Sequence, residues 1–521
     1  MRSTRRDVFR LAALGLAGTV LAPALARAAQ GAAFDIKSFG AAGDGRQIDS
    51  AAINRAIAAA ASGGGGIVRI PAGRYACHSI HLQSLVTLVL EPGATILAAP
   101  PPGFDAPDSN APWEAYQDFG HNHWHNSLIW GEGVHDAAIL GPGLIWGHGL
   151  ARGDASEPGL PSALAPGVAN KAIALKRCRN IVLRDFAIRE GGHFGIIATG
   201  VDNLTIDGLT IDTNRDGMNV DCCRNVEITD CYVNSPTDDG ICLKSSYALG
   251  EARATENVTI RGCHVTGYQL GSLLDAAYRP VDRRDPGVPT GRIKFGTESN
   301  GGFKNIAVNN CTFASCRGFA LETVDGGIAE DITFTDITMR DIRNAPLFLR
   351  LGARLRGPAG TQVGRLRRVI ISDVTCYAPA SDMPAIICGI DDHPVEDVSI
   401  DTVFFMHRGG ASALAAQVVP PEADRAYPEP REFGPLPAQG LFVRHARGLS
   451  VSNFEVETER PDARPFYWLD DVQGADFFRL RLPRRLTTPA FSLRDSSDFR
   501  VFASGPVADT RLDNVSHASV P

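Results

Sequence analysis

The sequence predicts an all-β solenoid, a parallel β-helix in which each turn of the chain stacks on the turn before it. The first observation is a repeat in which asparagine opens a run of alternating apolar and polar residues. This repeat starts at Asn180, Asn203, Asn225, Asn257 and Asn305, with spacings of 23, 22, 32 and 48 residues. Periods in the twenties indicate a solenoid, and the longer spacings indicate loops inserted between strands.

The second observation is the alternation itself, whose period of two residues is that of strands rather than helices. Weaker copies of the repeat begin at Asp331, Arg368 and Asp397. The sixth residue after each start is small or apolar in all eight copies: Phe186, Leu209, Cys231, Cys263, Cys311, Ile337, Val374 and Val403. We expect these residues to form one inward column of the core. Separate β-sandwiches with accidental spacing are the alternative.

The composition agrees with a single long domain over residues 30–521, because a solenoid core grows along one axis. The chain has 521 residues, 44% of them hydrophobic, and 54 glycines suited to many turns. Its formal charge of −7 argues against nucleic acid or an anionic membrane as a partner.

Residues 1–29 are predicted to be a targeting segment. Arg5 and Arg6 precede an apolar run over residues 11–25, and residues 26–28 fit a small-residue cleavage site. The arginine pair favours a twin-arginine signal, with a general secretory signal as the alternative. No other stretch is long and apolar enough to span a bilayer. We therefore expect export to a bacterial periplasm or to the extracellular space.

A helix is predicted near the start of the mature chain, where it would cover the open end of the solenoid. Asp49 or Ser50 is placed to cap this helix, and the glycines at 63–66 end it. Helical spacing is kept by Ala52, Ile53, Ala56, Ile57 and Ala60. A strand is expected to begin at residue 67.

The chain has eleven cysteines, which raises the question of disulfides in an exported protein. Cys231, Cys263 and Cys311 share one repeat phase, so we expect an inward ladder of small core residues. The adjacent Cys222 and Cys223 would point to opposite faces of a strand. Because the total is odd and no paired C-x-x-C spacing occurs, the sequence predicts mostly free, buried thiols and no structural zinc.

Three aspartates mark the candidate site. Asp216 lies thirteen residues after Asn203, Asp238 lies thirteen residues after Asn225, and Asp239 follows directly. Neighbouring carboxylates raise the pKa of one of them, which can then keep a proton and donate it to a leaving oxygen. Glycine follows both Asp216 and Asp239, so these two aspartates are expected to stack directly. Asp-Gly pairs that only form turns are the alternative.

Several motifs between residues 35 and 340 carry a family resemblance: residues 39–45, the Gly-rich helix exit, Pro71-Ala72-Gly73, and residues 90–94 and 141–147. They resemble the polygalacturonase family, family 28 of the glycoside hydrolases. The resemblance implies a right-handed, pectin-lyase-like β-helix and an inverting hydrolase. It also implies that Asp238 is the general acid and that Asp216 and Asp239 hold the attacking water. Inversion needs acid and base about 6.5–9.5 Å apart, which diagonal positions on adjacent coils could meet.

The sequence departs from the family at two motifs. Gly291 occupies the histidine position of Gly-His-Gly, and Ala320-Leu321-Glu322 replaces the Arg-Ile-Lys that grips a uronate carboxylate. Losing a bidentate arginine and a lysine is not conservative for an anionic sugar. We expect other cations and two acids to contact the substrate instead, with solvated surface charges as the alternative. These residues are Arg292, Lys294, Glu298 and Glu322.

Further substrate contacts are expected from residues near the aspartates: His193, Asn214 and Lys244. A structural histidine is the alternative for His193. The insertion over residues 268–302 is expected to close one end of the groove and to favour attack at chain ends.

Residues 101–127 break the coil pattern and contain the run His121-Asn122-His123-Trp124-His125. A metal site is one interpretation, since alternate positions of a strand share a face. We instead expect a loop that lines the groove and stacks aromatic rings on sugars. Residues 405–440, rich in proline and glycine, are expected to run over the surface. Short strands are expected near residues 449, 477 and 499.

The predicted function is hydrolysis of a pectic or related acidic polysaccharide. We expect a monomer that needs no cofactor and no metal. A polysaccharide lyase on the same scaffold is the enzymatic alternative and would need a basic residue, often with calcium. A carbohydrate-binding solenoid without activity is the other alternative, since a fold does not determine function.

Overall fold

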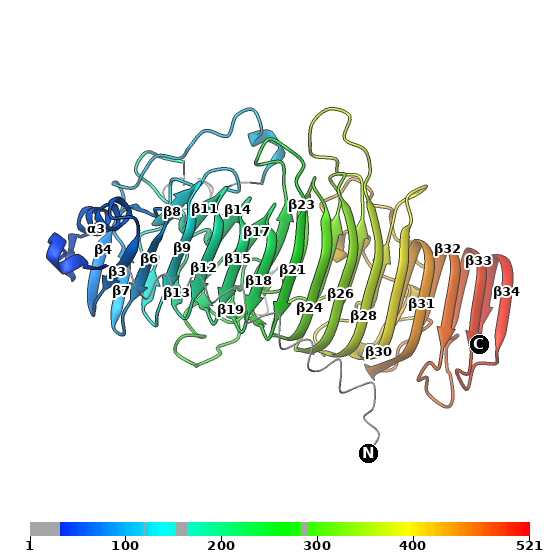
Figure 1. Cartoon of the computed structure of the whole chain (residues 1–521). Coiled ribbons are helices and arrows are strands. Elements are labelled where there is room, and N and C mark those ends of the chain that lie inside the picture. Colours follow the sequence, from blue (N-terminus) through cyan, green and yellow to red (C-terminus); the bar gives the residue numbers. More distant parts are fainter. Residues whose placement is uncertain (1–31, 119, 153–163, 283–288) are drawn as a thin grey trace, which may run out of the picture.

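The computed structural model describes residues 32–118, 120–152, 164–282 and 289–521. The strands wind into a parallel β-helix, which confirms the predicted fold class (Figure 1). Helix α3 (Ser50–Ser62) lies at one end of the rod and strand β34 (Thr510–Val520) at the other. Within the described ranges, no helix combines the length and apolar character needed to cross a membrane. The targeting segment predicted for residues 1–29 lies outside these ranges and stays a prediction.

Successive coils contribute strands to three parallel stacks. The first stack consists of β5 (Ile80–His81), β8 (Ile129–Glu132), β11 (Lys171–Lys176), β14 (Phe194–Thr199), β17 (Asp216–Asp221), β20 (Ile241–Ser245), β23 (Ile293–Ser299), β25 (Phe319–Thr323), β27 (Leu347–Leu351) and β29 (Ala385–Cys388). The second consists of β1 (Ala33–Asp35), β3 (Gly66–Ile70), β6 (Val86–Leu90), β9 (His135–Leu140), β12 (Arg179–Arg184), β15 (Asp202–Asp207), β18 (Arg224–Thr229) and β21 (Thr255–Arg261). The third consists of β2 (Asp44–Ile48), β4 (Gly73–Cys77), β7 (Ala94–Ala98), β10 (Leu144–Trp146), β13 (Ala187–Arg189), β16 (Thr210–Asp212), β19 (Tyr232–Asn234) and β22 (His264–Thr266).

In later coils the second and third strands fuse into single long strands. These are β24 (Phe303–Ala314), β26 (Ile328–Arg340), β28 (Arg365–Ala378) and β30 (Val395–Gly409), followed by β31 (Leu441–Arg460), β32 (Tyr467–Phe478) and β33 (Phe491–Phe502). The last three coincide with the strands predicted near residues 449, 477 and 499. Strand β34, which the sequence analysis did not predict, pairs antiparallel with β33 and covers its edge.

The repeated asparagines occupy a bend in each coil. Asn203, Asn225 and Asn257 have φ of 57°, 55° and 57°, a left-handed conformation that asparagine tolerates. Each side-chain amide donates to the amide oxygen of the asparagine one coil earlier, with Nδ2–Oδ1 distances of 2.8–3.0 Å from Asn203 through Asn305. The repeat in the sequence is therefore a hydrogen-bonded ladder.

Asn257→Ala is expected to lower the free energy of unfolding by about 1–2 kcal/mol, because the ladder loses two hydrogen bonds and alanine disfavours positive φ. Asn257→Gly should recover the backbone part of this loss, since glycine accepts the bend. Urea unfolding measures both variants. An alanine variant as stable as the unaltered protein would show that the asparagine ladder does not contribute to stability.

The predicted inward column is confirmed, since none of its eight residues is more than 4% exposed. All eleven cysteines are free and buried, as predicted. Cys222 and Cys223 lie just after β17 rather than within it, but they still point apart. Cys223 joins the core, and Cys222 Sγ contacts Ser246 O at 3.2 Å.

Helix α3 begins at Ser50 and packs its predicted apolar residues against the first coils. The expected cap by Asp49 is wrong, because its side chain makes no capping hydrogen bond. The Asp49 carboxylate instead accepts from the N–H groups of Ala42 and Gly43, at 2.7 and 2.9 Å. It therefore ties the loop that precedes the helix.

Candidate active site

Neighbouring strands β17 and β20 bring two of the three aspartates together. Met218 pairs with Ile241, so Asp216 and Asp239, each two residues earlier, lie opposite each other. The N–H of Gly217 donates to the carbonyl oxygen of Asp239 at 3.0 Å. This is the direct stacking that the Asp-Gly phase predicts.

Asp238 lies at the edge of this pair. Its carboxylate accepts from Arg215 Nη2 at 2.9 Å and from the N–H of Asp239 at 3.0 Å. Its side chain is 28% exposed, whereas Asp216 and Asp239 are each 4% exposed. Asp238 is therefore the member of the group that solvent reaches.

One oxygen of each aspartate lies within 4.8 Å of an oxygen of the other two. This spacing is shorter than the separation of about 6.5–9.5 Å expected for inversion. The reason is geometric: stacked strands lie about 4.8 Å apart, and Asp238 and Asp239 are chain neighbours. The stereochemical outcome therefore stays a prediction.

The next coil supplies cations to Asp239. Arg292 Nε lies 2.9 Å from Asp239 Oδ1, and Lys294 Nζ lies 3.5 Å from Asp239 Oδ2. Both basic residues are buried, with exposures of 1% and 2%. They were expected to face the substrate, but the structure pairs them with protein carboxylates because a buried charge is strongly destabilising when unpaired.

Glu322, on strand β25, is the second buried acid at these cations. Its carboxylate lies 3.6 Å from Lys294 Nζ and 3.9 Å from Arg292 Nη2. Burial raises the pKa of Glu322 to about 7, although both cations oppose this rise. Within the described ranges, Glu322 Oε1 has no hydrogen-bond partner. Because Glu322 is fully buried, the structure does not bring it to a surface where it could make the predicted contact with a sugar hydroxyl.

Burial and neighbouring charges shift the pKa values of Asp216 and Asp239 in opposite directions. Burial, reinforced by the charge of Asp238, raises the pKa of Asp216 well above its usual range. Burial acts in the same direction on Asp239, but Lys294 and Arg292 overcome it and lower the pKa of Asp239 to about 2. Asp239 is thus held as a carboxylate, whereas Asp216 keeps its proton to a higher pH than an ordinary aspartate does. Acid–base catalysis requires such a pair: an ionised carboxylate that accepts a proton, beside a carboxyl group that donates one.

Lys244 and Glu298 form a second buried ion pair, with Nζ and Oε2 2.6 Å apart. The N–H of Asp118 donates to Glu298 Oε1 at 2.9 Å, so the loop over residues 101–127 docks on strand β23. Both Lys244 and Glu298 were expected to bind substrate, but each already has a partner within the protein. Their pairing instead holds the loop beside the aspartates.

Among the residues that the structure describes, two groups have a spacing that could hold a metal ion: the three aspartates, and Asp118 with His121 and Glu298. Arg292 and Lys294 contact the first group, and Lys244 contacts Glu298 of the second. These side-chain cations occupy the oxygens that a hard metal ion would need. The donor sets therefore suit protein cations and protons better than a metal.

The predicted histidine run does not converge on one point. His123 lies 3.3 Å from Glu114, and His125 lies 2.9 Å from Glu132, while His121 faces Glu298 at 3.8 Å. The aromatic ring of Trp124, which was expected to stack on sugars, is fully buried.

His193 and Asn214 lie beside the aspartates. His193 is buried, and its ring centroid is 6.4 Å from that of His121. Burial, followed by the charge of Arg215, lowers the pKa of His193 well below its usual range, so its ring is neutral. The carbonyl oxygen of Asn214 accepts from the N–H and the hydroxyl of Thr237, which ties the loops before Asp216 and Asp238 together.

Two segments of the chain match models of known protein families. A family model described as right handed beta helix region matches residues 167–276, and a rhamnogalacturonase A/epimerase, pectate lyase-like model matches residues 33–101. A probable polygalacturonase of Vitis vinifera is 26% identical over 311 residues, which cover 54% of this chain and 60% of that protein. This chain is related to the polygalacturonases. The resemblance predicted from the sequence is confirmed.

A polygalacturonase of Malus domestica is 23% identical over 319 residues, which cover 59% of this chain and 60% of that protein. The chain thus spans 60% of the length of each of these two curated proteins.

Two solved structures share the fold of this polygalacturonase relative. An exopolygalacturonase of Thermotoga maritima has a TM-score of 0.53 and 16% identity, and covers 94% of this chain and 95% of its own. A family 28 exopolygalacturonase of Yersinia enterocolitica has a TM-score of 0.57 and 17% identity, and covers 89% of this chain and 78% of its own. These likenesses confirm the right-handed β-helix.

A distant segment of this polygalacturonase relative also reaches the site. Tyr427 and Glu429 belong to the stretch that was expected to run over the surface, yet both contact the cations at Asp239. Glu429 Oε1 lies 2.9 Å from Arg292 Nη2, and the Tyr427 hydroxyl lies 3.2 Å from Lys294 Nζ. The sequence carries no periodic signal for these residues, because they lie in a loop. The only local feature that could have drawn attention to them is a tyrosine and a glutamate that alternate with prolines over residues 427–430.

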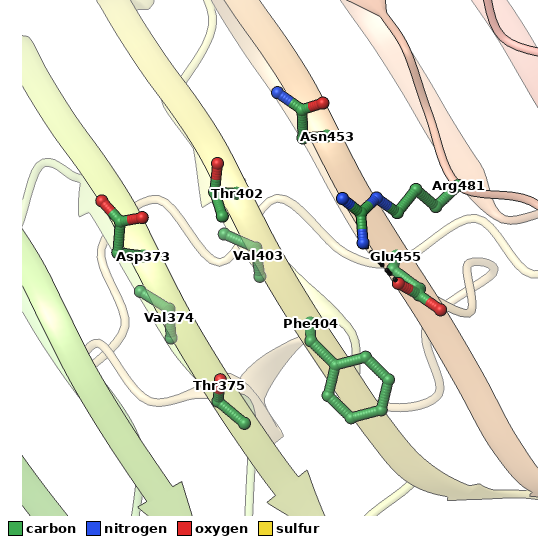
Figure 2. Close-up of a pocket in the computed structure, with 9 residues that line it drawn as sticks. All are labelled: Asp373, Val374, Thr375, Thr402, Val403, Phe404, Asn453, Glu455 and Arg481. Atoms are coloured by element: carbon green, nitrogen blue, oxygen red, sulfur yellow. Dashed lines mark ion pairs between the residues drawn. The ribbon is translucent and has the colours of Figure 1, made fainter.

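A surface hollow of about 240 Å³ lies elsewhere on the molecule, across β28, β30 and β31 (Figure 2). It is lined by Asp373, Val374, Thr375, Thr402, Val403, Phe404, Asn453, Glu455 and Arg481. These strands belong to the fused second and third stacks, whereas the aspartates border the first. The hollow is therefore separate from the candidate active site.

Proposed function

We propose that this polygalacturonase relative hydrolyses glycosidic bonds of a pectic polysaccharide by acid–base catalysis. The observation that carries the proposal is the gathering of three carboxylates on adjacent coils, with Asp239 buried against two cations and Asp238 partly open to solvent. Asp239, held as an anion, takes a proton from the attacking water. The Asp216–Asp238 pair supplies the proton to the leaving oxygen, with Asp238 as the member that a substrate reaches. The names of the curated relatives support a pectic substrate.

The lyase alternative is less well supported. A lyase needs a basic side chain that is free to remove a proton from the sugar ring. The basic residues placed at the aspartates in the described ranges, Arg215, Lys244, Arg292 and Lys294, all pair with carboxylates. Their protons are therefore stabilised rather than exchangeable. Hydrolysis fits this charge pattern better.

The sugar beside Arg292 and Lys294 is proposed to be uncharged. The three buried or partly buried cations there each pair with a protein carboxylate, so each is already engaged within the protein instead of gripping the carboxylate of a uronate. The six residues are Arg292, Lys294, Arg317, Asp239, Glu322 and Glu429. A neutral sugar next to the cleaved bond would occur in an alternating rhamnose–galacturonate chain.

Two sets of defined oligosaccharides test these proposals, one of galacturonate alone and one alternating rhamnose with galacturonate. We expect faster cleavage of the alternating set, with mass spectrometry showing products shortened from one end. Proton NMR of the first products should show an inverted anomeric centre. Unsaturated products that depend on calcium would indicate a lyase, and intact oligosaccharides would leave only a binding function.

A further inference from the structure

The segment that carries Tyr427 and Glu429 is fixed over the outer face of the first stack. Two buried arginines anchor it: Arg350 Nη2 donates to the carbonyl oxygens of Glu422 and Ala423 at 2.9 and 3.0 Å, and Arg444 Nη1 donates to that of Pro420 at 2.9 Å. Phe433, in the short helix η4 (Pro430–Phe433), packs into an apolar cluster with residues of β27, β29, β31 and β32. The segment is therefore held in place independently of any ligand.

We propose that this segment completes the substrate site, with Glu429 as a positioning residue for Arg292 and Asp239, and Tyr427 as a direct sugar contact. The inference rests on the proposed function and adds two residues to it. Glu429 lies 137 positions after Arg292, and Tyr427 lies 133 positions after Lys294.

Glu429 acts through Arg292. The guanidinium of Arg292 is held on two sides, by Asp239 at Nε and by Glu429 at Nη2, both at 2.9 Å. Glu429 Oε1 also accepts from Arg317 Nη1 at 2.9 Å. Without this second anchor, Arg292 can turn toward Glu322, which lies 3.9 Å away. Asp239 would then lose the fixed donor that keeps it ionised and oriented toward water.

Tyr427 would contact the sugar through its aromatic ring and not through a charged group. Its hydroxyl oxygen accepts from Lys294 at 3.2 Å and from Thr297 Oγ1 at 2.9 Å, which fixes the ring. The residue nevertheless remains 46% exposed, directly beside the buried cations. Lys294 Nζ and Arg354 Cζ lie 5.3 and 6.0 Å from the ring centroid, so two cations lie over the ring and hold it. The exposed part of a rigidly held aromatic ring suits the apolar C–H face of a sugar.

Three variants separate these roles, with Glu432→Gln as the matched control. Glu432 belongs to the same segment, is exposed and pairs only with its neighbour Arg431 among the ion pairs of the described residues. Glu429→Gln should lower kcat about tenfold with little change in KM, since it removes positioning and no sugar contact. Tyr427→Ala should raise KM about tenfold, and Tyr427→Phe, which keeps the ring, should stay within about threefold.

A second readout does not need turnover. In Glu429→Gln, Arg292 and Arg317 lose the buried carboxylate whose pKa they lower, so acid unfolding should begin at a higher pH than in Glu432→Gln. Oligosaccharide affinity of Tyr427→Ala, measured by calorimetry, should fall about tenfold. If both variants match Glu432→Gln in turnover, acid unfolding and affinity, the inference is overturned. If the unaltered protein cleaves no pectic oligosaccharide, the proposed function fails, while acid unfolding still decides the role of Glu429.

Discussion

Asp239→Asn is expected to lower kcat by about 10³-fold, because it removes the aspartate whose pKa its two cations lower to about 2. Asparagine fills the same space and still accepts a hydrogen bond from Arg292, so binding of the oligosaccharide should change little. Initial rates on the preferred oligosaccharide measure kcat and KM separately. Asp238→Asn should lose activity to a similar extent if Asp238 delivers the proton.

The matched control is Asp230→Asn. Asp230 is exposed and has φ of 52°, a conformation that asparagine adopts readily. This variant should keep full activity. Circular dichroism must show that Asp239→Asn is folded. A folded Asp239→Asn variant that turns over normally would exclude Asp239 as the base.

Arg292→Met is expected to lower the free energy of unfolding by about 3–5 kcal/mol, because it leaves buried carboxylates without their main partner. Asp239 and Glu429 each lose an ion pair of 2.9 Å; Asp239 keeps only Lys294, at 3.5 Å, and Glu429 keeps Arg317. Denaturant unfolding at neutral pH measures the loss. Arg224→Met is the control, since Arg224 forms an exposed ion pair of 2.9 Å with Glu256 and should cost at most about 1 kcal/mol.

The same variant should change the response to acid. The pKa of Asp239 falls from its usual 3.8 to about 2 on folding, so its ionised form stabilises the protein fully above pH 3.8. That stability is lost as the pH falls toward 2. Without Arg292 the pKa of Asp239 moves back toward 3.8, so less stability should be lost between pH 3.8 and pH 2. Identical acid-unfolding curves for the variant and the unaltered protein would show that Arg292 does not hold Asp239 ionised.

The sequence by itself determined the features that depend on the position of a residue within the coil repeat. The asparagine repeat marks a bend in each coil, so it predicted the solenoid, the inward column from Phe186 to Val403 and the stacking of Asp216 on Asp239. These features follow from the two-residue period of strands and from the length of one coil, both of which can be counted along the chain.

Only the tertiary structure decided which charges meet. Arg292 pairs with Glu429, which lies 137 residues later in a loop without any repeat. Burial and the charge of Asp238, rather than position in the motif, raise the pKa of Asp216 above its usual range. Desolvation and ion pairing depend on every atom around a group, including atoms from distant coils, and no local pattern encodes them.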